Sequence, residues 1–197
     1  MSNADRLKQQ LAFIIEMDKL KTIIRRSYLI NTDRFENDAE HSWHLAIMAM
    51  VLAEHANQAV DLPKVLKMVL VHDIIEIDAG DTYAYDPAGH QDQVEREQQA
   101  AERLFNLLPP DQAVEFRALW DEFEARATAE ARFAKGLDRL MPLLHNYHTQ
   151  GKAWRENNIS RQQVLDFNGY MNDGSERLWE FARELIDQAT NKGYLTP

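Results

Sequence analysis

The chain has 197 residues, 45% of them hydrophobic and 27% charged, a balance that supports a buried core and argues against disorder. Its formal charge of −10 disfavours DNA or RNA as a partner, and the lack of cysteine excludes disulfides and thiolate metal sites. The N-terminus has no signal-peptide pattern, and no apolar run approaches the roughly 18 residues that a membrane span requires. We therefore expect a cytoplasmic protein without a membrane segment.

Caps and hydrophobic periodicity predict helices along most of the chain. The first begins after a capping box at Ser2 and Asp5 and extends to about Lys21. We expect its apolar stripe to face the core; the stripe consists of Leu7, Leu11, Ile14 and Ile15. The following segment, 25–37, is predicted to be a polar loop.

The next two predicted helices are strongly apolar. Asp38 is expected to cap a helix that extends to about Asn57 and is apolar nearly all round, which is typical of a helix at the centre of a domain. Its apolar residues are Trp43, Leu45, Ile47, Met50, Val51 and Leu52. A third helix is expected to begin at Asp61, with Pro63 in its first turn, and to continue to about Ile77.

The second half of the chain adds more helices after a loop at 78–90. They are expected at 92–108, at 111–126, from Thr128 to about His148, after a capping box at Ser160 and Gln163, and from Ser175 onward. The predicted fold class is therefore all-α, a single-domain bundle of about seven to nine helices. That domain covers 1–197, with its core at about 10–150 and C-terminal helices at 160–190 packed on it.

Acidic and imidazole side chains occur within these apolar helices. His72 and Asp73 are adjacent among Val, Leu, Ile and Met. A buried carboxylate is unfavourable unless it is paired or bound to a cation, and a core histidine beside a buried salt bridge would by itself explain the pair. Three further residues favour a metal site: Glu76 is one turn after His72, His41 begins another apolar helix, and Asp138 lies on a third. Two imidazoles and two carboxylates suit a divalent ion that keeps positions open for water and substrate.

The order His…His-Asp…Asp on helices resembles that of the HD-domain phosphohydrolase superfamily. The surrounding motifs look like those of the subgroup that contains bacterial 5'-deoxynucleotidases. These motifs are Arg25-Arg-Ser-Tyr28, Glu36-Asn-Asp-Ala-Glu-His41-Ser, His72-Asp-Ile-Ile-Glu76 and Asp78-Ala-Gly-Asp81. The resemblance covers about residues 10–150 and implies the helical fold of that superfamily.

The resemblance also implies a site. A single divalent ion (Mn, Co, Fe, Ni, Zn or Mg) would be held by His41, His72, Asp73 and Asp138. Glu76 and Asp81 would serve catalysis and substrate binding, and Arg25 would contact the phosphate. The subgroup usually has tryptophan shortly after this arginine, whereas this chain has Tyr28. Dinuclear members of the superfamily carry two additional histidines between Asp73 and Asp138. Since this chain has only His90 there, a mononuclear site is favoured.

Several lesser candidates have two interpretations each. His44, one turn from His41, is either a substrate contact or a core residue, and Lys135 is either an ion-pair partner of an acidic ligand near the substrate or a solvated side chain. Four loop residues are candidates for the phosphate (Arg26, Arg34) or for stacking on a base (Tyr83, Tyr85). The pair His145 and His148 is expected at a polar helix end.

The predicted reaction is metal-dependent hydrolysis of a phosphate monoester, with a (deoxy)nucleoside 5'-monophosphate as the substrate. A dNTP or guanosine-alarmone hydrolase is an alternative, although such substrates usually demand more Lys and Arg around the site. A non-catalytic, metal-stabilised nucleotide-binding module is the alternative of another class, and it would have no need of Glu76 and Arg25. We also expect a homodimer, because twofold assemblies are common and family members form them. Its candidate interface residues are Trp120, Trp179 and Phe181.

Overall fold

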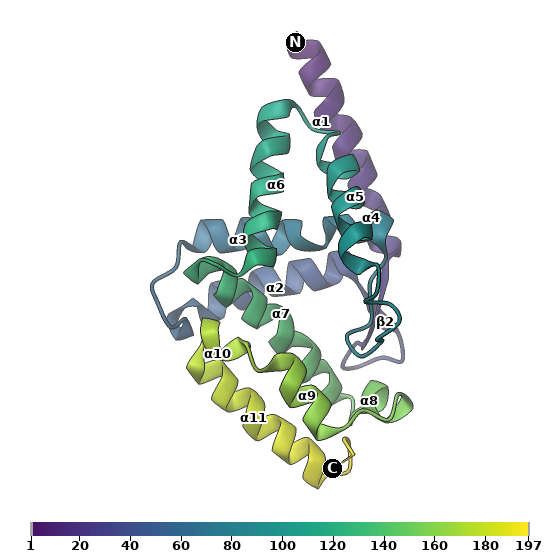
Figure 1. Ribbon diagram of the computed structural model, residues 1–197, viewed down its shortest axis with the longest axis vertical. Helices are drawn as coiled ribbons and strands as arrows, with labels where there is room; N and C mark the ends of the chain where they lie inside the picture. The colour runs from purple at the N-terminus through teal and green to yellow at the C-terminus, as the bar shows by residue number, and fades with distance from the viewer. Residues whose placement is uncertain (1, 197) are drawn as a thin grey trace.

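The computed structural model describes residues 2–196, which are helical along most of their length (Figure 1). The α-helices are α1 (Asn3–Met17), α2 (Asp38–Leu52), α3 (Leu62–Val71), α4 (Glu76–Ala79), α5 (Gln93–Phe105), α6 (Pro110–Ala125), α7 (Ala129–His148), α8 (Lys152–Glu156), α9 (Arg161–Asn168), α10 (Met171–Gly174) and α11 (Glu176–Asn191). The 3₁₀ turns are η1 (Asp18–Thr22), η2 (Ala53–His55) and η3 (His72–Ile75), and the strands are β1 (Ile24–Tyr28) and β2 (Phe35–Asn37).

The predicted helical fold class is confirmed, with one small sheet in addition. Two of the eleven α-helices in residues 2–196, α4 and α10, have only four residues, so nine longer ones remain, as many as the prediction allowed. None of the helices in this range combines the length and hydropathy needed to cross a membrane. The single domain over 1–197 stays a prediction.

Helix α7 lies at the centre of the fold and contacts α2, α3, α6, α10 and α11 (Figure 1). Thr128 caps it as predicted, by accepting a hydrogen bond from the Ala131 amide. Its buried side chains belong to a large apolar cluster that also includes residues of α2, α3 and α11. A second cluster lies between η3, α5 and α6. The turn η3 therefore lies where the two clusters meet, which holds its side chains against packed surfaces on both sides.

The predicted third helix is divided, and the division falls at the candidate site. Helix α3 ends at Val71, the chain continues as the 3₁₀ turn η3, and α4 resumes for one turn before Gly80 ends it at φ +76°. The prediction of one continuous helix to about Ile77 was therefore wrong. A 3₁₀ stretch in the middle of a helix often marks a functional position, since it re-aims side chains relative to α geometry.

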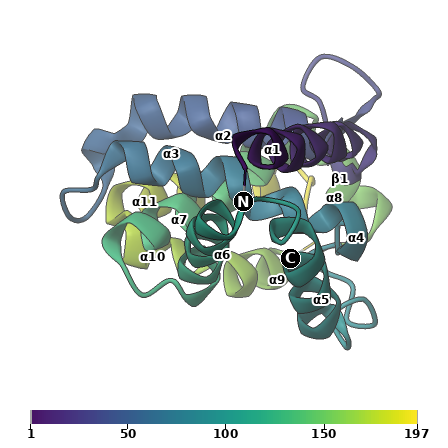
Figure 2. The ribbon, with the colours of Figure 1, turned by 90° about the horizontal axis from the view of Figure 1, so that it is seen from above.

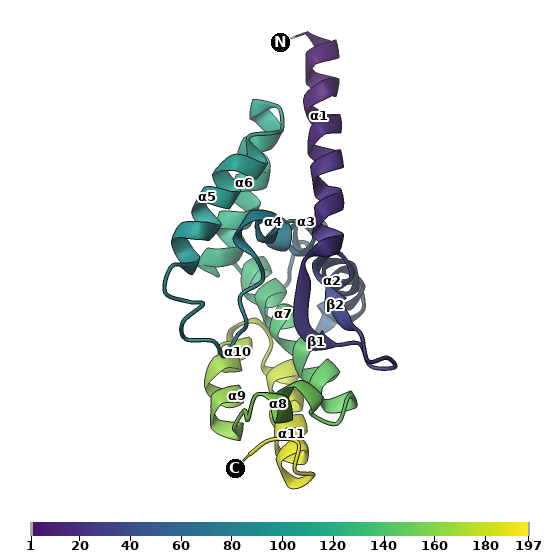
Figure 3. The same ribbon diagram turned by 90° about the vertical axis from the view of Figure 1, so that its right-hand side faces the viewer.

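Helix α1 departs from the sequence expectation. Its apolar stripe does not face the core, because its four members are 49–73% exposed: Leu7, Leu11, Ile14 and Ile15. The contacts of α1 with α6 use the other side, where Phe13 packs edge-on against Phe116 and Arg6 pairs with Asp111. Figure 3 shows α1 projecting beyond the rest of the molecule.

Helix α2 also differs, because Asn37 and not Asp38 is its N-cap. The Asn37 side chain accepts from the Glu40 amide and Glu40 reciprocates in a capping box, so Asp38 becomes the first helical residue and is fully buried. The helix ends at Leu52 and is buried on one side only. Its outer side is 42–65% exposed and consists of Trp43, Ile47, Met50 and Val51. The prediction of a helix surrounded by the core was wrong.

The predicted polar loop at 25–37 is a β-hairpin. Strands β1 and β2 pair antiparallel, with Ile24 opposite Asn37 and Tyr28 opposite Phe35. Because successive side chains of a strand point to opposite faces, Arg25 and Ser27 are more buried than Arg26. The hairpin thereby carries Arg25 to the inside of the molecule.

The C-terminal helices follow the prediction closely. Ser160 and Gln163 form the expected capping box, and the Ser175 side chain accepts from the Leu178 amide at the start of α11. Gly151 follows α7 at φ +67°, and a Cβ atom there would lie 2.6 Å from Tyr194, so a side chain would not fit.

Candidate metal centre

Four predicted ligands from three elements converge in the interior. His41 comes from α2, His72 and Asp73 from η3, and Asp138 from α7, and all four are buried. Asp138 Oδ1 lies 3.0 Å from His41 Nε2 and 3.6 Å from His72 Nε2. Asp73 Oδ1 lies 3.0 Å from His72 Nε2, and Asp73 Oδ2 lies 3.8 Å from His41 Nε2. Potential ligand atoms of His41, His72 and Asp73 all lie within 4.8 Å of one another.

The orientation of His72 suits metal binding. Its Nδ1 lies 2.9 Å from the Val69 carbonyl oxygen, to which it donates when it carries the proton. The lone pair then resides on Nε2, which is buried, has no hydrogen-bond partner and faces the two carboxylates. Two imidazoles and two carboxylates form a donor set for a hard or borderline divalent ion. The residues present therefore fit the predicted metal.

The charges of the four side chains are strongly coupled. Burial lowers the pKa of His72, but the negative charges of Asp73 and Asp138 outweigh burial and raise it to about 10. For Asp73, burial raises the pKa while His72 and Arg25 lower it, and the net pKa lies well below its usual range. In the metal-free centre the His72 imidazole and the Asp73 carboxylate thus stabilise each other's charged forms, and a divalent ion would displace the His72 proton.

Arg25 lies against the centre among acidic side chains. Its Nη1 donates to Asp73 Oδ2 at 2.7 Å and to Asp38 Oδ1 at 3.0 Å, and it lies 3.6 Å from Asp81 Oδ1. The sequence reasoning missed Asp38 because it read this residue as a helix cap. Burial and the charge of Asp73 raise the pKa of Asp38 to about 7 against the opposing effect of Arg25. The sequence did indicate a role for Asp38, because a residue three positions before His41 lies on the same helix face as His41.

Glu76 and Asp81 line the same polar pocket as His72, Asp73 and Asp138. Glu76 is buried, and its Oε2 has no hydrogen-bond partner. Burial, followed by the charges of Asp73 and Asp81, raises the pKa of Glu76 to about 10 in the metal-free protein. Burial also raises the pKa of Asp81, with the charge of Arg25 acting against it.

Arg139 is a further residue of this pocket that the sequence reasoning did not single out. Its Nη2 lies 3.5 Å from Asp138 Oδ2, its guanidinium lies over the Phe167 ring at 4.5 Å, and it donates to the Tyr170 hydroxyl. The sequence did offer a signal for Arg139. It directly follows the buried Asp138 on an apolar helix, where a second charge also needs a partner of opposite charge.

The lesser candidates lie in different places. Lys135 lines the polar pocket, and its ion pair is with Glu124 at 2.7 Å, not with an acidic ligand as one of its two interpretations had it. Tyr28 lies outside, stacked on Phe35 and donating to Glu156. His44 is half-buried and does not line this pocket.

The remaining lesser candidates also lie in different surroundings. Arg34 pairs with Glu40 on the surface, whereas Arg26 lies over the Tyr83 ring at 5.9 Å. His145 is buried, so the expectation of a polar helix end was wrong for it. Its ring lies 5.8 Å from that of His44.

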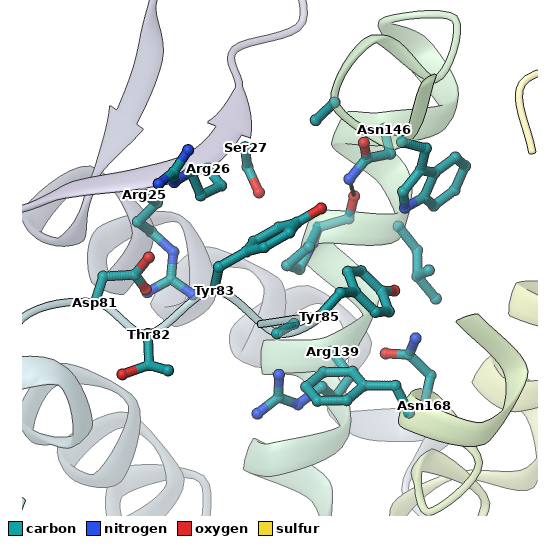
Figure 4. A pocket seen from close by; sticks show the side chains of 16 residues that line it. Arg25, Arg26, Ser27, Asp81, Thr82, Tyr83, Tyr85, Arg139, Asn146 and Asn168 are labelled. Carbon is teal, nitrogen blue, oxygen red and sulfur yellow. Dashed lines mark hydrogen bonds and ion pairs between the residues drawn. The ribbon is translucent and has the colours of Figure 1, made fainter. Parts of the chain in front are cut away.

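A second, aromatic pocket opens directly beside the polar one (Figure 4). Its apolar wall consists of Tyr83, Tyr85, Pro142, Leu143, Trp154 and Phe167. The two pockets share five lining residues: Arg25, Asp81, Thr82, Arg139 and Phe167. In Figure 4 the labelled charged groups lie on the side of Arg25 and Asp81, and the tyrosine rings extend away from them. The arrangement offers a charged end and an aromatic end to one elongated molecule.

Comparisons with known proteins agree with this geometry. A family model described as an HD domain matches residues 17–179. The 5'-deoxynucleotidase HDDC2 of Bos taurus is 32% identical over 136 residues, 68% of this chain and 64% of that protein. The Homo sapiens HDDC2 is 31% identical over 68% of this chain and 65% of its own length, so the chain spans slightly less than two thirds of these relatives.

Over nearly its whole length the chain is similar to a solved structure. It is the crystal structure of a predicted metal-dependent phosphohydrolase from Magnetospirillum magnetotacticum MS-1, with 54% sequence identity. The match covers 98% of this chain and 96% of that one, with a TM-score of 0.93.

Proposed function

This chain belongs to the HD-domain family, and we propose that it is a metal-dependent phosphohydrolase that removes phosphate from (deoxy)nucleoside 5'-monophosphates. The observation that carries the proposal is the junction of the two pockets. Three of the four metal-binding candidates, His72, Asp73 and Asp138, line the polar pocket, and the aromatic pocket meets it at Arg25 and Arg139. A phosphate bound between these arginines would leave its nucleoside beside the aromatic wall. The names of the similar proteins, a phosphohydrolase and 5'-deoxynucleotidases, support the same reaction class.

The metal proposed for the four ligands is one divalent ion, as the sequence implied. When bound, such an ion supplies Lewis acidity toward a phosphoryl oxygen and lowers the pKa of water. Arg25 and Arg139 bring two guanidinium groups to the edge of the same pocket, where planar donors match phosphate oxygens and stabilise charge in the transition state.

Two acidic residues take the remaining roles. Glu76 has a buried, unpartnered Oε2 in the polar pocket and acts as the general base that receives the proton of the attacking water. Asp81 lines both pockets and accepts a hydrogen bond from a sugar hydroxyl. The tyrosine rings beyond it, Tyr83 and Tyr85, supply an apolar surface for the base.

The test is phosphate release from a panel of ribo- and deoxyribonucleoside monophosphates with Mn, Co or Mg, comparing wild type with Asp73→Ala. We expect release by the wild type and none by the variant, because loss of a buried ligand removes the metal. Tripolyphosphate from dNTPs, or pyrophosphate from guanosine alarmones, as the sole product would favour the alternative hydrolases. No product from any of these substrates, with metal shown to be bound, would contradict the hydrolase proposal and favour a binding module.

We propose that the partner is a second copy of this chain. The proposed interface differs from the one predicted from the sequence. Trp120 is buried in the second cluster, so its expected place in the interface was wrong. Helices α1 and α2 lie along the same edge of the molecule (Figure 2), and each carries exposed apolar residues. Contiguous exposed apolar surface is unusual on monomers, and an uncharged stripe is where two copies of net charge −10 repel least.

The prediction is a homodimer that Ile15→Glu with Met50→Glu dissociates, since both side chains are more than half exposed on these stripes. Light scattering coupled to size exclusion measures the mass. Phe181→Glu, on α11, is the matched control and should leave the dimer intact. A monomeric wild type at micromolar concentration would refute the dimer. If only Phe181→Glu dissociated it, the interface would instead include α11.

A further inference from the structure

The carboxylate of Glu36 is surrounded by buried nitrogen atoms. Glu36 lies on β2 and is 1% exposed. Its Oε2 lies 3.3 Å from His41 Nδ1, 3.9 Å from His145 Nδ1 and 4.0 Å from Arg25 Nε. All four of these atoms are buried and have no hydrogen-bond partner. Unsatisfied buried polar atoms are costly, so a cluster of four facing one another calls for a function.

His41 connects this cluster to the metal centre. Its Nε2 faces Asp138 Oδ1 at 3.0 Å, on the side of the other ligands. An imidazole that gives the Nε2 lone pair to a cation carries its proton on Nδ1, and that proton needs an acceptor. Glu36 Oε2 is the carboxylate oxygen in front of Nδ1. Metal binding would therefore turn two unpartnered atoms into a charge-assisted hydrogen bond.

Arg25 connects the same cluster to the phosphate side. Its Nη1 donates to Asp73 and Asp38, while its Nε points toward Glu36 Oε2. One carboxylate thus lies behind both a metal ligand and the arginine assigned to the phosphate. Its negative charge favours the proton on His41 Nδ1 and keeps the guanidinium at the edge of the polar pocket.

We propose that Glu36 is a positioning residue that orients His41 for the metal and Arg25 for the phosphate. The inference rests on the proposed function for the role of Arg25, but its effect on the metal does not require any substrate. Residues that hydrogen-bond to a metal-binding histidine typically contribute about 10- to 100-fold to metal affinity.

A second metal site is the competing explanation, because donor atoms of Glu36, His44 and His145 also lie within 4.8 Å of one another. Two positive or proton-bearing groups argue against a cation there. The Arg25 guanidinium and the Nδ1 of His41 face Glu36 Oε2, the oxygen that also lies 3.9 Å from His145 Nδ1.

The test is metal affinity, measured by competition with a chelating dye in the absence of substrate. Glu36→Ala is expected to weaken binding about 10- to 100-fold, and Glu36→Gln, which keeps an acceptor oxygen, measurably but less, by about 3- to 10-fold. Glu40→Gln is the matched control, since this neighbour pairs with Arg34 on the surface and should keep wild-type affinity. This graded rescue by glutamine separates positioning from a general loss of structure.

Three results would overturn the inference. The first is wild-type metal affinity in Glu36→Ala; if alanine prevents folding, wild-type affinity in Glu36→Gln serves instead. The second is a glutamine variant as weak as the alanine variant. The third is a wild type that binds two ions per chain, while Glu36→Ala and His145→Ala each bind only one. Glu36 would then be a metal ligand. Failure of the proposed function looks different, since the wild type would then release no phosphate while these affinities still changed as expected.

Discussion

Replacing Glu76 with glutamine is expected to lower kcat on the best monophosphate substrate by about 10²- to 10⁴-fold, the range that a general base contributes. Glutamine keeps the size of the side chain but cannot take a proton from water. The residue lines the polar pocket without an ion-pair partner, so its loss leaves the four predicted ligands and their contacts in place. Metal affinity should therefore stay within a few-fold of wild type, which the same dye competition measures.

Glu97→Gln is the matched control for this prediction. Glu97 lines the same pocket, and its carboxylate accepts from Gln93 on its own helix, so the same chemical change is made a short distance away. We expect near wild-type kcat for this variant. An active Glu76→Gln enzyme would remove Glu76 from the mechanism, and a variant that loses its metal would instead make Glu76 a ligand.

The candidate site could be predicted from the sequence where a charged or polar residue stands among apolar neighbours. A histidine and an aspartate among Val, Leu and Ile cannot be explained by helix propensity, and the same holds for Asp138 on α7. The structure brings these residues together because α2, α3 and α7 pack on one another. Capping signals were equally informative at Thr128, Ser160 and Ser175, since a cap depends only on neighbours within one turn.

Other features depend on contacts that periodicity does not encode. An amphipathic stripe shows that a helix has an apolar side, but not what covers it, and the stripe of α1 faces outward. Asp38 satisfied the rule for a cap, yet Asn37 just before it took that role and left Asp38 to pair with Arg25. The hairpin at 25–37 was missed because its apolar residues are few, and the inward position of Arg25 depends on contacts with residues far along the chain.

The second large effect expected is a fall in the stability of the metal-free protein as the pH rises from 5 to 9. Three buried groups have pKa values raised by folding: Asp38 to about 7, and Glu76 and His72 to about 10. Burial raises the two carboxyl values, whereas the charge of Asp73 raises that of His72 against burial. A group with a raised pKa stabilises the fold fully below its unfolded pKa and loses that contribution as the pH rises through its folded pKa.

All three groups therefore act in the same direction across this window. The lowered pKa values of Asp73 and Asp138 act only in acid, below their ordinary titration range. A tenfold change in an acid dissociation constant corresponds to about 1.4 kcal/mol, so a loss of several kcal/mol in the free energy of unfolding is expected between pH 5 and 9. Denaturant unfolding in the presence of a chelator measures it.

A bound divalent ion should reverse this trend, because it favours the deprotonated forms of the same side chains. The gain in Tm on adding metal is expected to grow with pH, since binding releases more protons at low pH and is weakened there. Asp38→Asn should remove the share of the pH dependence that Asp38 contributes below about pH 7 and leave the part at higher pH, which separates the buried centre from general repulsion among surface acids. A metal-free protein whose stability does not change from pH 5 to 9, or a metal-induced gain that shrinks as the pH rises, would show that these groups are not held as the structure places them.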